Sequence, residues 1–158
     1  MTLEDIPAVA VMEKETFTDP WSEKVYRETL AYEEVVYLVA VDDEAVVSVT
    51  EDAELNNGSY QIFGACGIRN IVGEGEITNV MVKPQYRNRG IAAQMLSQLL
   101  EEGKKLGASD FTLEVRASNA SAIHLYEKIG FVTEGVRKDF YDHPKEDALI
   151  MWKRKAVE

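Results

Sequence analysis

The segment from Glu76 to Leu106 most constrains how this chain can fold. An apolar strand pattern, Glu76 to Val82, precedes a short basic loop, and apolar residues then recur at spacings of three and four as far as Leu106. This order predicts a strand, a tight loop and a long amphipathic helix from Gly90 that is closed by Gly107. We therefore expect a strand-to-helix loop at Lys83 to Ile91.

That loop has the chemistry of an anion site. Free backbone N–H groups at a helix N-terminus, together with the positive end of the helix dipole, can hold a pyrophosphate. Gly90 and Ala92 remove side chains that would block close approach, and Arg87 and Arg89 add positive charge. An ordinary strand-to-helix turn with two solvated arginines is the alternative interpretation.

Length and composition favour one compact domain. The chain has 158 residues, 46% of them hydrophobic, so we expect a single domain over residues 1–158. It contains no apolar run near the ~20 residues of a membrane helix, and Met1 to Ala10 lack a secretory pattern. Cys66, the single cysteine, forms no internal disulfide. These features predict a cytoplasmic protein without membrane attachment.

The formal net charge is -11, from 28 acidic and 17 basic residues. A surface of this sign repels phosphate backbones, so direct nucleic-acid binding is not expected. An acidic surface is commonly a solubility device, and it can also attract a basic protein or peptide. Charge alone leaves both interpretations open.

The N-terminal third predicts helices followed by a strand. Thr2 to Glu15 has an amphipathic helical pattern, and Ser22 can cap a second helix from Glu23 to Ala31. Val35 to Val41 reads as a buried strand. Asp42 to Ser59 is acidic, contains Asn-Gly and has few large apolar residues, so we expect a strand edge followed by the least ordered internal segment.

The remaining segments alternate strands and helices. The expected elements are a hairpin of Tyr60 to Val72 and Glu76 to Val82 turning at Gly73-Glu74-Gly75, a strand over Asp110 to Val115, a short helix ended by Gly130, and strands over Phe131 to Phe140 and Ala148 to Arg154. In the strand Asp110 to Val115, polar and apolar residues alternate, so one face carries polar side chains.

Three residues could take part in chemistry. Glu114 lies in mid-strand, where partial burial would raise its pKa toward that of a useful base; a structural ion pair with Arg116 or Arg137 is the alternative. Tyr126 falls on the buried side of its helix and could be a core tyrosine. Asn119 can cap the helix that follows it.

Other reactive residue types carry no site pattern. Cys66 is flanked by Ala65 and Gly67 with no base nearby, so we expect a small core residue. His124 and His143 lack ligand spacing and are expected at the surface or in caps. No metal is implied.

Several motifs together resemble the GNAT acetyltransferase superfamily. Arg87, Gly90 and Ala92 match its coenzyme A motif. The match is closer to the bacterial N-acetyltransferases that act on a ribosomal-protein alanine, at Pro20-Trp21-Ser22-Glu23-Lys24, at Leu113-Glu114-Val115-Arg116-Ala117-Ser118-Asn119-Ala120-Ser121-Ala122-Ile123, at Leu125-Tyr126-Glu127-Lys128-Ile129-Gly130-Phe131, and at Glu146-Asp147-Ala148-Leu149-Ile150-Met151. These motifs occur in the family's order between about residue 17 and residue 151.

The resemblance implies a fold and a cosubstrate. The implied fold is an α/β GNAT fold whose mixed, mostly antiparallel sheet is flanked by helices and splayed at its central strands, beside Val80 to Val82. Acetyl-CoA would bind with no metal. The implied coenzyme contacts are Val80, Met81, Val82, Arg87, Asn88, Arg89, Gly90, Ile91, Ala92 and Asn119.

The resemblance also implies a reaction. Glu114 would act as the base and Tyr126 as the acid in direct acetyl transfer to the N-terminal amine of a ribosomal protein, with Trp21, Phe140 and Tyr141 lining the peptide groove. The expected enzyme is a monomer or weak dimer. A GNAT enzyme acting on lysine side chains or a small amine is one alternative, and a non-catalytic acetyl-CoA-binding module is another.

Two departures from the family pattern stand out. No strand pattern precedes Thr2, where the family has its first strand, which bears on the stability of the sheet edge. The segment Asp42 to Ser59 is longer than in the family, which could alter access of the acceptor. Neither departure touches the loop or the candidate catalytic residues.

Overall fold

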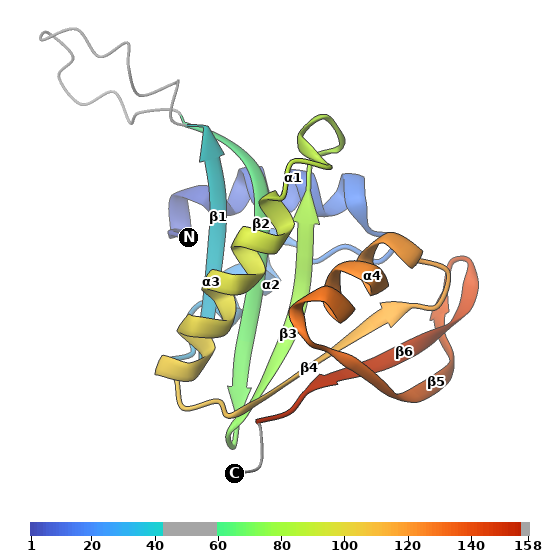
Figure 1. Cartoon of the computed structure of the whole chain (residues 1–158). Helices are drawn as coiled ribbons and strands as arrows, with labels where there is room; N and C mark the ends of the chain where they lie inside the picture. The colour runs from blue at the N-terminus through green and yellow to red at the C-terminus, as the bar shows by residue number, and fades with distance from the viewer. Residues whose placement is uncertain (43–59, 156–158) are drawn as a thin grey trace, which may run out of the picture.

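A computed structural model describes residues 1–42 and 60–155, which form a six-stranded sheet flanked by helices (Figure 1). The strands are β1 (Val35–Asp42), β2 (Gln61–Ile71), β3 (Glu74–Val82), β4 (Asp110–Arg116), β5 (Val132–Asp142) and β6 (Lys145–Lys153), in the order β1-β2-β3-β4-β6-β5. Only the β3–β4 pair is parallel among the described strands. The expected mixed, mostly antiparallel sheet is confirmed.

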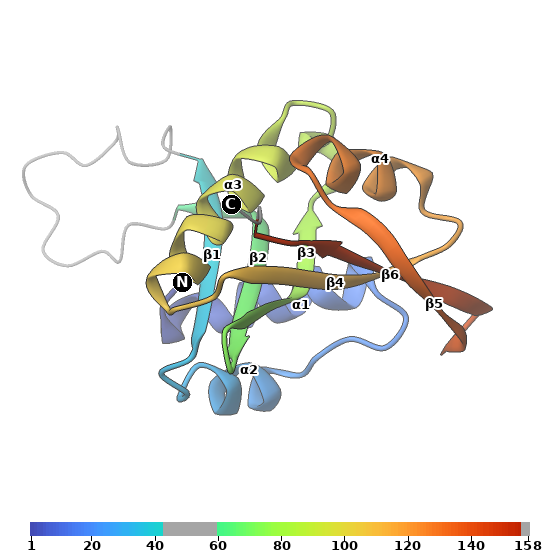
Figure 2. The same cartoon turned by 60° about the horizontal axis from the view of Figure 1, so that its bottom comes forward.

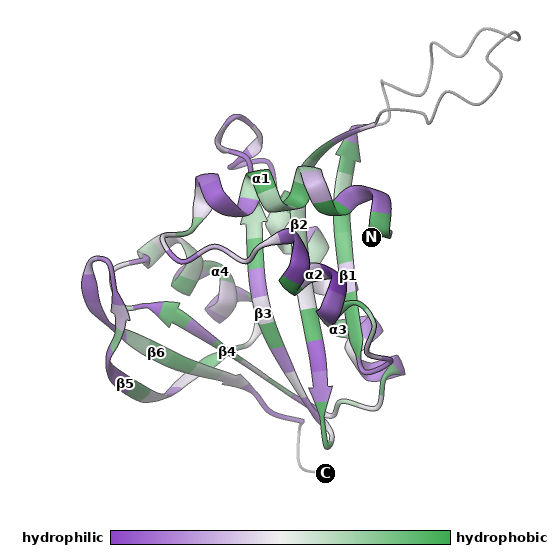
Figure 3. Ribbon diagram, turned by 180° about the vertical axis from the view of Figure 1, so that it is seen from behind, coloured by the Kyte–Doolittle hydropathy of each residue, from purple (hydrophilic) through white to green (hydrophobic). Residues whose placement is uncertain are grey.

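Helices cover the two faces of the sheet unequally (Figures 1 and 2). One face packs against α3 (Ile91–Lys105) and α4 (Ala120–Ile129), and the other against α1 (Ile6–Thr16), which follows the 3-10 helix η1 (Leu3–Asp5), and α2 (Glu23–Thr29). Seen from behind, α1 and α2 lie over β1 to β3, whereas no described helix covers β4, β6 and β5 (Figure 3). No described helix is both long and apolar enough to cross a membrane.

The long helix α3 begins and ends where its sequence predicts. Gly90 precedes it with a φ of 76°, and Gly107 follows it with a φ of 96°, conformations that glycine adopts without steric cost. Its buried residues are Met95, Leu96, Leu99, Leu100 and Gly103. A Cβ atom at Gly103 would lie 2.7 Å from Cε1 of Phe111, so this glycine lets the helix approach β4 closely.

The centre of the sheet is splayed. Strands β3 and β4 pair only over Glu74 to Glu76 and Asp110 to Thr112, and the described residues form no further β3–β4 pairs. Opposite β2, the register shifts between Gly67 and Ile68, which leaves Thr78 as the extra residue of a bulge on β3. The opening expected beside Val80 to Val82 is therefore present.

Side chains on the bulge turn toward α1 and α2. The hydroxyls of Tyr37 and Thr78 are 2.7 Å apart, and Nδ2 of Asn79 lies 2.8 Å from the hydroxyl of Tyr26. Because Thr78 and Asn79 both face this layer, the alternation along β3 is broken, and Ile77 and Met81 belong to cores on opposite faces of the sheet.

Several expected boundaries are wrong. The β2–β3 turn is at Val72 and Gly73, not at Gly73-Glu74-Gly75, because Gly75 lies inside β3, where its Cβ would be 2.7 Å from Cδ1 of Phe111. Strand β6 begins at Lys145, three residues before the expected Ala148. The polar run Lys145 to Asp147 hid this start, although it pairs with β5 from Lys145 onward.

Two other elements differ from expectation by one or two residues at their ends. Helix α2 ends at Thr29 and β5 extends from Val132 to Asp142. The expected cap at Ser22 is confirmed, because its hydroxyl accepts from the Val25 N–H at 3.3 Å. Asp42 ends β1, and the rest of the segment Asp42 to Ser59 lies outside the described residues, so the expectation about its order stays a prediction.

The amino group of Met1 donates to the carbonyl oxygen of Tyr37 in the edge strand β1 at 3.1 Å. The chain then enters η1 directly. The N-terminal segment therefore contacts the edge strand β1 through this hydrogen bond.

Candidate active site

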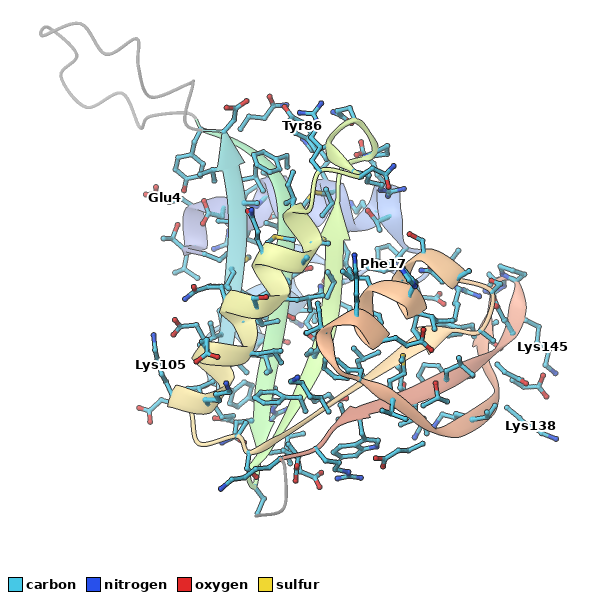
Figure 4. The ribbon with its side chains drawn as sticks, viewed as in Figure 1. Glu4, Phe17, Tyr86, Lys105, Lys138 and Lys145 are labelled. Carbon is cyan, nitrogen blue, oxygen red and sulfur yellow. The ribbon has the colours of Figure 1, made fainter. Side chains whose placement is uncertain are left out.

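A cavity of about 1030 Å³ passes through the splayed part of the sheet. We call its two sides the α3–α4 half, which includes the loop before α3 and the first two turns of α4, and the α1–α2 half, which includes the end of α1 and the loop that follows it. Phe17 lines the α1–α2 half and is seen between β3 and α4 in Figure 4. Both halves meet at Val80 to Val82 and at Leu113 to Arg116.

The loop before α3 presents open space and backbone donors to the cavity. Gly90 lines the cavity, and a Cβ atom built there would meet no atom within 4 Å. Asn88 also has a left-handed conformation, with a φ of 60°. The first N–H groups of α3 have no partner within the helix, so this end is suited to an anion such as a pyrophosphate.

The splayed edge of β3 presents further donors. The N–H of Lys83 donates to Phe63 of β2 at 2.8 Å. Because N–H groups alternate in direction along a strand, those of Val82 and Val80 point away from β2, toward the opening. Both residues line the cavity. This edge can therefore donate hydrogen bonds to a ligand inserted between β3 and β4.

The two loop arginines lie in different surroundings. Arg87 lines the cavity, and its Nε donates to the carbonyl oxygen of Val82 at 2.9 Å, which ties the loop to the end of β3. Arg89 does not belong to the cavity lining and packs over the ring of Tyr86, 5.4 Å from its centroid. Tyr86, at the top of Figure 4, stacks on Phe63 at 4.5 Å.

Asn119 and Tyr126 line the α3–α4 half from α4. The side chain of Asn119 caps this helix by accepting from the Ala122 N–H at 3.2 Å, so its predicted cap is confirmed. Tyr126 is 8% exposed and packs edge-on against Phe131. Its hydroxyl has no hydrogen-bond partner among the described residues, and burial raises the pKa of Tyr126 to about 12.

Glu114 lines the α1–α2 half. Its neighbours Leu113 and Val115 belong to the core beneath α3 and α4, so Glu114 projects from the opposite face of the sheet to Tyr126. Its Oε1 accepts from Nη1 of Arg137 at 2.6 Å. Burial raises the pKa of Glu114, Arg137 opposes that rise, and Glu76 adds to it. The ion pair anticipated as the structural alternative is thus present in the cavity wall.

The three expected groove residues also line this cavity. Trp21 packs edge-on against Tyr26, with the ring centroids 5.5 Å apart. The rings of Phe140 and Tyr141 pack edge-on, with their centroids 5.0 Å apart, and the Arg116 guanidinium lies 4.1 Å from the centroid of the Tyr141 ring. The structure therefore brings together Trp21 from before α2 and two aromatic residues from β5.

Arg116 was not singled out as a site residue. It joins two walls of the cavity, because it donates to Thr18 in the α1–α2 loop at 3.2 Å and to the carbonyl oxygens of His143 at 3.1 Å and Pro144 at 3.0 Å. It also pairs with Glu146. Arg116 lies within the motif Leu113 to Ile123, and this position could have identified it as a site residue from the sequence.

Glu13 was also missed. It is a buried carboxylate in the wall of the α1–α2 half, on the buried face of α1 with Val9 and Met12. An acidic residue on an otherwise apolar helix face was the signal that could have found it.

The remaining reactive residue types do not line the cavity. Cys66 is fully buried in the core, as expected, and burial raises the pKa of its thiol to about 12. His124 and His143 are exposed, which confirms their predicted surface positions. The described residues contain no group of three or more metal-ligating side chains.

The six-stranded mixed sheet, opened beside β3 and crossed by one cavity, is the architecture of an acyltransferase fold. Residues 6–131 match the family model "Acetyltransferase (GNAT) family", and the chain belongs to the GNAT acetyltransferase family. Among similar proteins, the chain is 36% identical over 153 residues to a Bacillus subtilis protein provisionally assigned as a ribosomal protein bS18-alanine N-acetyltransferase, covering 96% of this chain and 91% of the relative.

Two further comparisons agree. The ribosomal protein bS18-alanine N-acetyltransferase of Escherichia coli K12 is 30% identical over 149 residues, which cover 93% of this chain and 89% of that protein. The crystal structure of the ribosomal-protein-S18-alanine N-acetyltransferase from Escherichia coli superimposes with a TM-score of 0.76 at 28% identity, over 100% of this chain and 94% of that one. The GNAT fold that the sequence motifs implied is thereby confirmed.

Proposed function

We propose that this protein transfers the acetyl group of acetyl-CoA to the N-terminal α-amino group of a ribosomal protein that begins with alanine. The observation that carries the proposal is a single cavity crossing the sheet, with the Gly90 loop and Tyr126 on one face and Glu114 on the other. The names of the similar Bacillus and Escherichia proteins support the choice of acceptor.

The α3–α4 half suits the coenzyme. Its pyrophosphate would lie against the first N–H groups of α3, where Gly90 leaves space, with Arg87 beside it. Asn88, Ile91, Ala92 and Asn119 border the same space. Arg89 would add long-range positive charge from beside Tyr86 rather than a contact inside the cavity.

The α1–α2 half suits the acceptor amine. An α-amino group has a pKa of ~7.7–8.0, so much of it is protonated at neutral pH, and a modest base suffices to deprotonate it. Glu114 would accept that proton, directly or through water. Arg137 holds Oε1, and Oε2 has no hydrogen-bond donor among the described residues. The ion pair would thus orient the base while leaving one oxygen for the proton.

The transfer joins the two halves. The free amine attacks the thioester carbonyl carbon, a C–N bond forms, and the C–S bond then breaks. The N–H groups of Val80 and Val82 would stabilise the oxyanion formed at the carbonyl oxygen. Tyr126, whose raised pKa keeps its hydroxyl protonated at neutral pH, would donate a proton to the departing thiolate.

The net charge of the protein is consistent with a basic protein substrate. An enzyme of net charge -11 would attract a basic ribosomal protein by long-range electrostatics and would not bind nucleic acid directly. We place it in the cytoplasm, as a monomer or weak dimer of one domain over residues 1–158, and acting without a metal.

A panel of acceptors tests this function. With acetyl-CoA, peptides with a free N-terminal alanine should be acetylated faster than peptides with a blocked N-terminus and an internal lysine, and faster than polyamines, with the site located by mass spectrometry. Preference for lysine or polyamine would support a different GNAT acceptor. Binding of acetyl-CoA with no turnover on any acceptor would favour a binding module.

A further inference from the structure

Two acidic side chains are buried among the described residues, and both lie near α1. Asp5 is 4% exposed and Glu13 is 3% exposed. Asp5 is away from the cavity and accepts from the N–H of Thr2 at 2.6 Å and from the hydroxyl of Tyr60. Glu13 lies in the cavity wall. The two residues therefore offer a comparison between a buried acid at the site and one outside it.

Glu13 is held by neutral donors from three other parts of the fold. Its Oε1 accepts from the backbone N–H of Trp21 at 3.2 Å, and its Oε2 accepts from the Tyr26 hydroxyl at 2.6 Å and from Nδ2 of Asn79 at 3.1 Å. Asn79 also donates to the Tyr26 hydroxyl at 2.8 Å. None of the ion pairs in the described residues involves Glu13.

These bonds join the parts that form the α1–α2 half. Trp21 lies in the α1–α2 loop that lines this half, Tyr26 lies on α2, and Asn79 lies beside the bulge of β3. A buried carboxylate without a cation costs desolvation energy, and an apolar residue of similar volume would fill a purely structural site more cheaply. Glu13 is distinguished by its capacity to accept from all three parts at once.

We propose that Glu13 is a positioning residue for the acceptor, which fixes Trp21 and the Asn79 edge of β3 so that the amine and the thioester meet in one geometry. This inference rests on the proposed function. Glutamine in its place has one oxygen and an NH₂ group, so it cannot accept from all three donors. At least one of them would lose its partner, and the α1–α2 half would lose its shape while the α3–α4 half is unchanged.

Kinetics of matched variants test the role. Glu13→Gln should raise the peptide KM by about tenfold, with acetyl-CoA affinity by calorimetry unchanged. Asp5→Asn makes the same chemical change at the other buried acid of this region and should lower thermal stability without moving the peptide KM. Tyr26→Phe removes one donor and leaves the other two, so its KM should lie between those of wild type and Glu13→Gln.

The position of Trp21 can be measured without turnover. The chain contains two tryptophans, so Trp152→Phe leaves Trp21 as the single indole fluorophore. In that background, Glu13→Gln should increase acrylamide quenching of Trp21, whereas Asp5→Asn should not. This measurement stays valid if the acceptor has been misidentified, which separates a failure of the inference from a failure of the proposed function.

Two results would overturn the positioning role. One is an unchanged peptide KM and unchanged quenching in folded Glu13→Gln. The other is an equal rise of KM in Glu13→Gln and Asp5→Asn, which would mean that loss of any buried acid near α1 loosens the domain. Increased quenching confined to Glu13→Gln would sustain the structural half of the inference even with a different acceptor.

Discussion

At Glu114, two opposing effects act on one carboxyl group. Burial disfavours its charged form, and Arg137 favours it through a 2.6 Å hydrogen bond. The net direction is a raised pKa, which brings the carboxyl closer to the pKa of an α-amine and so makes it a better base. Glu114 and Tyr126 project from opposite faces of the sheet, which suits removal of a proton on one side and donation on the other.

Conservative replacement of the two residues should separate their roles. Glu114→Gln and Tyr126→Phe preserve size and should each lower turnover by on the order of 10²–10⁴-fold with little change in acetyl-CoA affinity. Between neutral pH and about 9, the turnover of Glu114→Gln should increase by a larger factor than that of wild type, because more of the acceptor amine is already deprotonated at high pH. The turnover of Tyr126→Phe should increase little, because that variant still lacks its proton donor. Near-wild-type turnover in both variants would refute these assignments.

The ion pair itself should be visible in the pH profile. A base works when ionised, so turnover rises as the pH increases through the pKa of Glu114. Arg137→Gln removes the charge that lowers this pKa, so the acidic limb of the kcat profile should move to higher pH. The measurement is kcat across the acidic range for both proteins. A limb that stays in place would mean that Glu114 does not set it.

Among the elements, α3 is flanked at its two ends by glycines in left-handed backbone conformations, which glycine adopts without strain. Gly90 borders the cavity and Gly107 does not, and their φ values are 76° and 96°. Alanine at either position costs left-handed strain of about 1–2 kcal/mol. The two positions thus impose a similar cost on the fold while differing in what lies next to the new methyl group.

Gly90→Ala should lower acetyl-CoA affinity by about tenfold, because its Cβ enters space reserved for the ligand. Gly107→Ala should lose similar stability and keep its affinity. Calorimetric titration with acetyl-CoA, together with thermal melting, measures both quantities. Equal affinities in the two variants would remove the Gly90 loop from the coenzyme site.

Of the two cores on opposite faces of the sheet, the one beneath α3 and α4 has more buried residues than the one beneath α1 and α2. Leu99 is fully buried in this larger core, so Leu99→Ala should reduce the free energy of unfolding by about 2–5 kcal/mol. Val11→Ala on α1, at a residue 56% exposed, should change it by no more than about 0.5 kcal/mol. Urea denaturation of both variants gives the comparison. Similar losses would mean that this core does not dominate stability.

Much of the local structure was predictable from the sequence, because it depends on neighbours along the chain. The periodicity of α3, its flanking Gly90 and Gly107, and the caps Ser22 and Asn119 all act within a few residues. The loop before α3 was predictable for the same reason. Alternation over Asp110 to Val115 placed Glu114 in a strand, and the apolar spacing that includes Leu125 and Ile129 placed Tyr126 on a helix.

Tertiary structure alone decided which distant segments meet. The sheet is splayed because β3 and β4 form three parallel pairs and then no more among the described residues. Gly75 and Gly103 come from distant parts of the chain, and at each of them a Cβ atom would clash with the ring of Phe111. The sequence left Arg116 and Arg137 open as partners of Glu114, and only the fold selects Arg137. No local pattern contains the network in which Glu13 contacts Asn79, 66 residues away. Local propensity specifies each element, whereas the geometry of the cavity arises only where side chains distant in sequence pack together.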